Sequence, residues 1–207
     1  MRAERERGLE ESVTEGPIEE RLREVIIGEI EPRSIVIADY DPAWPERFDR
    51  EEARIRTALG QAALAVEHIG STSVPGLAAK PIVDILLVVE DSAEEESYAP
   101  VMEEAGYVLR VREPGWNEHR MFRTPDRDAH VHVYSAGCPE IQRNLTFRDR
   151  LRRNIDNRNR YERTKRELAA REWPDMNAYA EAKTEVIESI LAASQAEAEQ
   201  AEGEISF

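Results

Sequence analysis

The sequence lacks the cysteines that a disulfide framework or a cysteine-based zinc finger needs, because Cys138 is its only cysteine. It also lacks an apolar run approaching the roughly 20 residues of a membrane-spanning helix. Its first residues, MRAERERGLEE, have no apolar segment typical of a signal peptide. We therefore expect no membrane partner and a reducing, cytoplasmic setting. A chain of 207 residues can bury enough surface to fold without such covalent or metal cross-links.

Basic charge is also scarce: 28 Lys and Arg stand against 43 Asp and Glu, for a net charge of −15. Proteins that bind nucleic acid depend on basic faces, so we expect no bulk nucleic-acid partner. The deficit is uneven, because residues 1–31 carry a net charge of −5 and residues 192–207 carry −4. The part between them is only mildly acidic, and a small anionic ligand such as a nucleotide remains compatible with it.

This charge distribution predicts three segments. Residues 1–33 are expected to form an acidic N-terminal extension, partly disordered, with a short helix from Pro17 to Ile27. Residues 34–191 are expected to form a single domain, and residues 192–207 an acidic tail of frayed or solvated helix.

Apolar periodicity within the domain predicts an α+β fold, a mixed β-sheet flanked by helices with a helical C-terminal segment. Strands are expected at Ser34–Ala38, Ala63–Ile69, Ile82–Val89, Tyr107–Arg112, His119–Thr124 and Ala129–Tyr134. Helices are expected at Pro45–Leu59, at Ser92–Ala105 and from Pro139 onward, with breaks near Asn154–Asn157 and Pro174.

Asp84 is the first candidate for chemistry. It lies in Ile82–Val89, a nearly all-apolar run typical of a central strand that is covered on both faces. Burying an unpaired carboxylate is costly, so Asp84 must be paired, hydrogen-bonded, protonated or bound to a metal. A purely structural aspartate, bonded to the backbone or to one arginine, is the alternative.

The second candidate is the segment just before that strand. Gly70 would let the backbone approach a ligand closely, and Ser71, Thr72 and Ser73 supply hydroxyl and N–H groups. Such groups at a helix start can hold an anion such as phosphate. An ordinary turn is the alternative, since clusters of Ser, Thr and Gly are common in turns.

The stretch HIGSTSVPGLAAKPIVDILLVV, residues 68–89, resembles the GrpB-like (glutamate-rich protein B) family of the nucleotidyltransferase (DNA polymerase β-like) superfamily. The resemblance spans roughly residues 35–191. Its other matching motifs are Gly106-Tyr107, HVHVY at His130–Tyr134, FRDRLRRN at Phe147–Asn154, YERTKRELA at Tyr161–Ala169 and YAEAKTEVI at Tyr179–Ile187. It implies a nucleotidyltransferase-like mixed sheet and transfer of a phosphoryl or nucleotidyl group to an unknown small molecule.

In active members of that superfamily, Gly-Ser holds a nucleoside triphosphate, and three carboxylates hold two divalent metal ions. Gly70, Ser71 and Asp84 match the pattern. The second carboxylate position is Leu86, and the third falls in the strand of His130 and His132. The carboxylate triad is therefore incomplete, which leaves catalysis itself an open question.

His130 and His132 are two residues apart on a strand and so share one face. With Asp84 they form a catalytic candidate, since two imidazoles and a carboxylate could bind one divalent metal such as Zn²⁺ or Mn²⁺, with Mg²⁺ the superfamily's alternative. His68 is a further candidate ligand. Acid–base work, hydrogen bonds to phosphate, or an ordinary half-exposed strand are the other interpretations.

Several basic residues are candidates for phosphate contacts, although surface pairing with glutamate is the alternative for each. They are Lys80, Arg120, Arg148, Arg152, Lys165 and Lys183. The pairs Tyr161–Lys165 and Tyr179–Lys183 are spaced i, i+4 and are expected to pack with a charged rim. Trp116 is a candidate to flank the pocket.

Three hypotheses follow. The first is nucleotidyl or phosphoryl transfer with Asp84 at its centre. The second is a non-catalytic module that binds a nucleotide or a CoA-like ligand, with a link to coenzyme A metabolism by family analogy, because some relatives are fused to dephospho-CoA kinase. The third is a single-metal His/Asp hydrolase.

Overall fold

The computed structural model describes residues 24–28, 36–171, 173, 179 and 181–205. Five strands run at Ala65–Ile69 (β1), Val83–Val89 (β2), Val108–Glu113 (β3), His119–Arg123 (β4) and Ala129–Ser135 (β5). The α-helices are Ala43–Leu59 (α2), Ala99–Glu104 (α3), Pro139–Arg153 (α4), Ile155–Ala169 (α5) and Thr184–Ile205 (α7). Short 3₁₀ helices run at Gly60–Ala62 (η1), Ser71–Ser73 (η2) and Glu95–Ser97 (η3).

The strands form one sheet in the order β1-β2-β5-β4-β3. The central pair β2–β5 is parallel, and every other neighbouring pair is antiparallel. The sheet is therefore mixed and helices cover it, so the predicted α+β class is confirmed.

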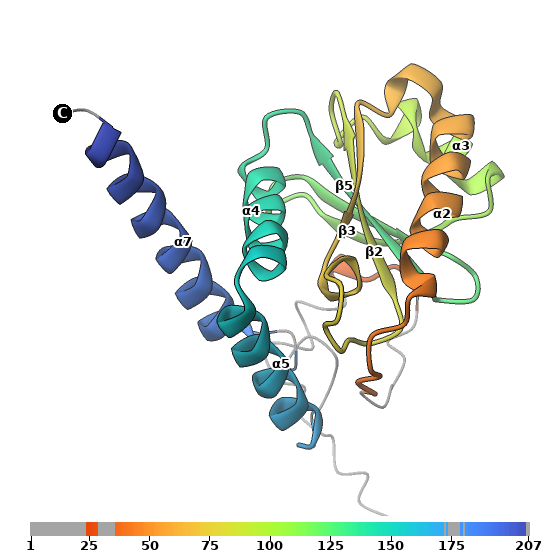
Figure 1. Ribbon diagram of the computed structural model, residues 1–207. Coiled ribbons are helices and arrows are strands. Elements are labelled where there is room, and N and C mark those ends of the chain that lie inside the picture. Colours follow the sequence, from red (N-terminus) through yellow and green to blue (C-terminus); the bar gives the residue numbers. More distant parts are fainter. Residues whose placement is uncertain (1–23, 29–35, 172, 174–178, 180, 206–207) are drawn as a thin grey trace, which may run out of the picture.

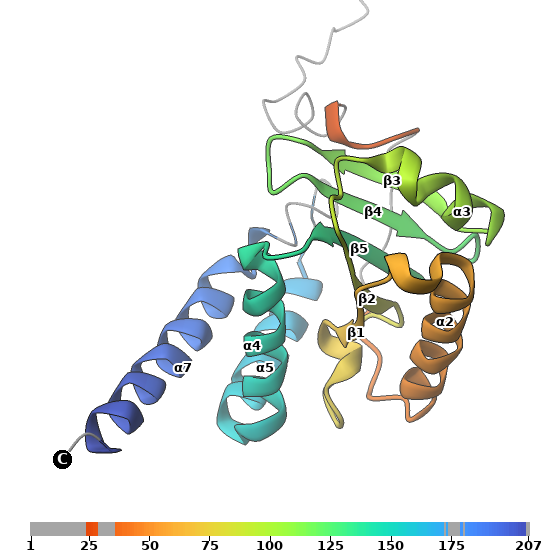
Figure 2. The ribbon, with the colours of Figure 1, turned by 90° about the horizontal axis from the view of Figure 1, so that it is seen from above.

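Helices cover the two faces of the sheet as separate layers, with α2 and α3 on one side and α4, α5 and α7 on the other (Figure 1, Figure 2). We name these the core face and the site face. On β2, Val83, Ile85, Leu87 and Val89 are fully buried among the apolar residues of the core face. Leu86 and Val88 point the opposite way and pack with Ile69 and Tyr134 beneath α4. Alternation along a strand produces this division.

The C-terminal helices hold together around a small core of their own. Leu151 of α4, Tyr161 of α5 and Ile190 of α7 pack there with Val74 and Leu77, which follow η2. This cluster fixes the helices against the loop that leads into β2, so they form one wall of a cavity above the site face.

Two predicted elements need correction. Of the strand expected at Ser34–Ala38, the described part forms a single bridge between Ala38 and Ala79. The helix expected over 92–105 is η3 followed by the short α3, because Ser92 is fixed in a loop by bonds to Ser135 and Glu118. Pro100 then lies at the first turn of α3, where its missing N–H costs nothing.

The prediction of a helical C-terminal segment is confirmed for Pro139–Ala169, with a break at Asn154, and for Thr184–Ile205. α4 ends at Arg153, and the side chain of Asn154 caps α5 by accepting from the backbone N–H of Asn157 at 2.9 Å. The expected break at Pro174 and most of the helix expected from Pro17 lie outside the described residues. Among the described helices, none combines the length and apolar character required to cross a bilayer.

Candidate functional site

A cavity of about 650 Å³ lies between the site face and the C-terminal helices. Its floor comes from β2, β4 and β5 and its wall from α4 and α5, together with Lys183 and Ile187. Of the predicted site residues, it is lined by Gly70, Ser71, Thr72, Lys80, Asp84, His130, His132, Lys165 and Lys183. Trp116, for which packing alone was the other interpretation, also lines it.

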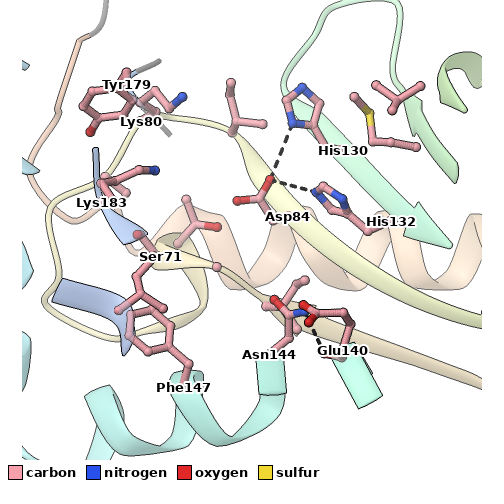
Figure 3. A pocket seen from close by; sticks show the side chains of 18 of the residues that line it. Ser71, Lys80, Asp84, His130, His132, Glu140, Asn144, Phe147, Tyr179 and Lys183 are labelled. Atoms are coloured by element: carbon pink, nitrogen blue, oxygen red, sulfur yellow. Dashed lines mark hydrogen bonds and ion pairs between the residues drawn. The ribbon is translucent and has the colours of Figure 1, made fainter. Parts of the chain in front are cut away.

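Asp84, His130 and His132 converge in this cavity (Figure 3). The parallel register pairs Asp84 with His130, and alternation along β5 brings His132 to the same face. Asp84 Oδ1 lies 3.5 Å from His130 Nδ1 and 3.7 Å from His132 Nε2. One ligand atom from each of the three residues lies within 4.8 Å of the others.

These separations fit one metal ion. Two ligands bound to Zn²⁺ at tetrahedral angles are about 3.4 Å apart, close to the two distances from Asp84 Oδ1 to the histidine nitrogens. Two nitrogen donors and one oxygen donor suit a transition metal better than Mg²⁺. Leu86, at the position of the second superfamily carboxylate, is fully buried among apolar side chains. The described residues thus include one group that could hold a single ion.

The electrostatics of Asp84 favour a bound cation. Burial acts to raise the pKa of its carboxyl group, but His130 and His132 outweigh burial and hold that pKa well below its usual range. Asp84 therefore stays ionised under all ordinary conditions, as a metal-binding carboxylate must.

Gly70 has a different role from the predicted one. Its φ of 68° lies in the left-handed region, and a Cβ there would come within 2.4 Å of Asp84 Oδ2. Only glycine leaves room for the Asp84 carboxylate at this point. The close approach is therefore made by a carboxylate of the protein itself.

The hydroxyl groups after Gly70 divide into two kinds. Thr72 Oγ1 lies 3.1 Å from His68 Nε2, and Ser73 donates to the Gly70 carbonyl at 2.6 Å. Both are engaged within the protein, and Ser73 is not among the cavity residues. Ser71 hydrogen-bonds the Tyr161 side chain, but it also faces the cavity in Figure 3 and is the hydroxyl of this segment best placed for a ligand.

Three lysines gather at the same cavity. The ammonium groups of Lys80 and Lys183 lie 5.2 and 4.7 Å from the centre of the Tyr179 ring. Lys165 donates to the Ala78 carbonyl and lies 4.8 Å from the Tyr161 ring. The predicted tyrosine–lysine contacts are thus present, but they face the cavity.

Burial, and repulsion among these lysines, lower the pKa of Lys165 to about 7 and that of Lys183 to about 8. The Tyr179 hydroxyl is buried and has no hydrogen-bond partner among the described residues. An anion seated here would accept from that hydroxyl and compensate the crowded positive charge.

His68 does not join the metal-ligand group. It pairs with Ile85 across β1 and β2 and therefore points to the core face. Its ring stacks on Phe48 at 4.8 Å. Burial lowers its pKa to about 4, which keeps the imidazole neutral. The sequence-based assignment of His68 as a ligand misjudged which face of β1 it occupies.

The predicted arginines also lie outside the cavity. Arg120 points to the core face beside Phe122 and pairs with Glu95 at 2.5 Å. Arg148 pairs with Glu67 at 2.8 Å, and Arg152 donates to the Ser73 carbonyl at 2.8 Å. These arginines stabilise the surroundings of the site, because their donors are used within the protein.

The sequence-based prediction missed His119, which lies at the start of β4 on the site face. Its Nε2 is 3.0 Å from His132 Nδ1, and its Nδ1 is 2.7 Å from Glu113 Oε2. The signal was present in the alternation of HRMFR: because Phe122 is in the core, His119, Met121 and Arg123 must face the cavity side. Glu140 was also missed; it lines the cavity, and burial raises its pKa.

Comparison with known proteins gives a consistent picture. A family model described as "GrpB protein" matches residues 34–193. A UPF0157 protein of Halalkalibacterium halodurans is 55% identical over 175 residues, covering 84% of this chain and 90% of that protein. A dephospho-CoA kinase of Mycolicibacterium paratuberculosis is 32% identical over 169 residues, covering 69% of this chain and 42% of the kinase.

Among solved structures, the crystal structure of the conserved protein GrpB from Enterococcus faecalis is similar to this chain. The TM-score is 0.67 at 35% sequence identity. The similarity covers 76% of this chain and 98% of that one.

Proposed function

The chain belongs to the GrpB family, and from this premise we propose that it transfers a phosphoryl or nucleotidyl group to a small molecule. One observation carries the proposal. A group of three metal-ligand side chains and a cluster of three lysines line one cavity, with Ser71 among them. Figure 3 shows the metal-ligand group together with Ser71, Lys80 and Lys183. Metal ligands beside ammonium groups are what a phosphate-bearing substrate requires.

Each part has a role in that chemistry. Lys80, Lys165 and Lys183 would bind the phosphate oxygens, with the Ser71 and Tyr179 hydroxyls donating to them. Asp84, His130 and His132 would hold one transition-metal ion, Zn²⁺ or Mn²⁺, which supplies Lewis-acid stabilisation of charge on the transferred group. The nucleoside triphosphate and the divalent metal are parts of this proposal.

A metal-dependence experiment tests it. The thermal shift caused by a non-hydrolysable nucleoside triphosphate is measured with Mn²⁺, with Zn²⁺ and with EDTA. We expect Asp84→Asn to abolish the metal-dependent part of the shift, because it removes the charged ligand. Glu90→Gln is the matched control, since Glu90 is an exposed carboxylate just beyond the end of the same strand. An unchanged metal-dependent thermal shift in Asp84→Asn would contradict the proposal.

The same experiment separates the other interpretations. Nucleotide stabilisation that survives EDTA in full would favour a non-catalytic binding module. Coenzyme A and dephospho-CoA belong in the ligand set, because one similar protein is a dephospho-CoA kinase.

A single-metal hydrolase is the second candidate function. The two-imidazole, one-carboxylate ligand set favours it, since such sets leave a position open for a metal-bound water. Release of inorganic phosphate from a phosphomonoester, without an acceptor and dependent on added metal, would support hydrolysis over transfer.

A further inference from the structure

A line of polar side chains runs from the cavity toward the edge of the sheet. Asp84 Oδ1 faces His132 Nε2 at 3.7 Å. The other nitrogen of His132, Nδ1, lies 3.0 Å from His119 Nε2. The second nitrogen of His119, Nδ1, lies 2.7 Å from Glu113 Oε2. Each imidazole thus uses both of its nitrogens within a single row.

The middle member of this row is held firmly. His119 is only 5% exposed. The Tyr134 ring stacks on it at 4.9 Å, and the Trp116 ring meets it edge-on at 5.4 Å. The His119 and His132 rings are nearly parallel, 15° apart. Neither ring can flip without breaking these contacts.

The hydrogen bonds specify where the protons are. An ionised Glu113 can only accept, so His119 carries its proton on Nδ1. The neutral His119 ring then accepts at Nε2, and His132 must donate from Nδ1. In the neutral His132 ring, this leaves the lone pair of Nε2 facing Asp84 Oδ1. Two electron-rich atoms that face each other at this distance are suited to a shared cation.

We propose that Glu113 and His119 are positioning residues, which hold His132 as the Nδ1–H tautomer and thereby make its Nε2 a metal ligand. The proposal rests on the proposed function, because it requires a metal at Asp84, His130 and His132. Partners that orient metal-binding histidines in this way typically contribute about 10–100-fold to metal affinity.

Matched variants measure that contribution. Zn²⁺ and Co²⁺ affinity is measured by chelator competition in His119→Leu, which cannot accept from His132, and in His119→Gln, whose amide oxygen can. His119→Leu should bind the metal about 10–100-fold more weakly than wild type. His119→Gln should stay within about threefold, with the same Co²⁺ visible spectrum. Glu113→Leu and Glu113→Gln form a second such pair at the half-buried end of the row, should a His119 variant fail to fold.

Each outcome decides something. If wild type binds the metal and His119→Leu binds it equally tightly, the positioning role is overturned while the metal site stands. If wild type binds no metal, the proposed function fails and this inference fails with it. ¹⁵N NMR of the metal-free protein is an independent check: a neutral His132 ring protonated on Nε2 instead of Nδ1 would overturn the proposal whatever the metal affinity.

Discussion

The two faces of the central sheet differ in whether their polar groups have partners inside the protein. On the core face, His68 bonds Thr72, Arg120 pairs with Glu95, and Tyr98 donates to the Ser92 carbonyl. These polar groups are satisfied inside the protein. On the site face, an ionised carboxylate, two imidazoles, three lysines and a buried tyrosine hydroxyl line one cavity, and that hydroxyl has no partner within the described part of the chain.

The same strands build both faces. The alternation of side chains along each strand therefore places structural residues on one face and the residues of the candidate site on the other. Burying a polar group costs free energy unless a partner compensates it. The core face meets that requirement with internal partners. On the site face, the Tyr179 hydroxyl lacks a partner among the described residues, and neighbouring lysines repel one another. These uncompensated polar and charged groups identify the site face as the place for a ligand.

Neighbouring residues on β2 test this contrast most strongly. Ile85→Ala on the core face should lower the free energy of unfolding by about 2–5 kcal/mol, because it leaves a cavity in a fully buried cluster. Asp84→Asn on the site face should lower it by a smaller amount in metal-free protein, because the isosteric amide leaves no cavity. Urea denaturation at neutral pH measures both. A larger loss in Asp84→Asn than in Ile85→Ala would abolish the distinction between the faces.

The second prediction concerns pH and the core face. The folded-state pKa of His68 is about 4, below its unfolded value of 6.5, because burial disfavours the charged ring. Its contribution to stability is therefore complete above pH 6.5 and is lost as the pH falls toward 4. It amounts to about 3 kcal/mol. In urea titrations between pH 7 and 4, His68→Gln should show a shallower loss of stability than wild type. Identical slopes would mean that His68 does not titrate as proposed.

The third prediction concerns pH and the site face, and its expected effect is smaller. An anion favours charged lysines, so binding must protonate Lys183 above its pKa of about 8 and Lys165 above about 7. Sulfate does not titrate in this range and is a suitable probe. Its affinity for metal-free protein should fall at least about tenfold from pH 7 to pH 9. Calorimetry on Lys183→Met should show weaker binding and a flatter pH profile; an unchanged profile would place the anion elsewhere.

The sequence predicted much of the fold because its main signals are local. The apolar run at Ile82–Val89 and the break expected near Asn154–Asn157 each identify an element or its end. The helix expected over 92–105 failed because Ser92 is held by partners from β5 and the β3–β4 turn, which no local pattern reveals.

The part of the site that depends on the alternation of side chains along a strand could be predicted from the sequence. Asp84, His130 and His132 were identified together, since one residue interrupts an apolar strand and the others share a face. The pattern does not state which face of β4 meets the C-terminal helices. For that reason Arg120 was placed at the cavity and His119 was overlooked, although they are adjacent in the chain.

The central claim is that Asp84, His130 and His132 form a single transition-metal site. Anomalous diffraction from crystals soaked in Zn²⁺ or Mn²⁺ tests it most directly. The account predicts one strong peak about 2.0–2.2 Å from Asp84 Oδ1, His130 Nδ1 and His132 Nε2, and no such peak in Asp84→Asn. A peak away from these three atoms, a second ion beside the first, or no peak at saturating metal would contradict it.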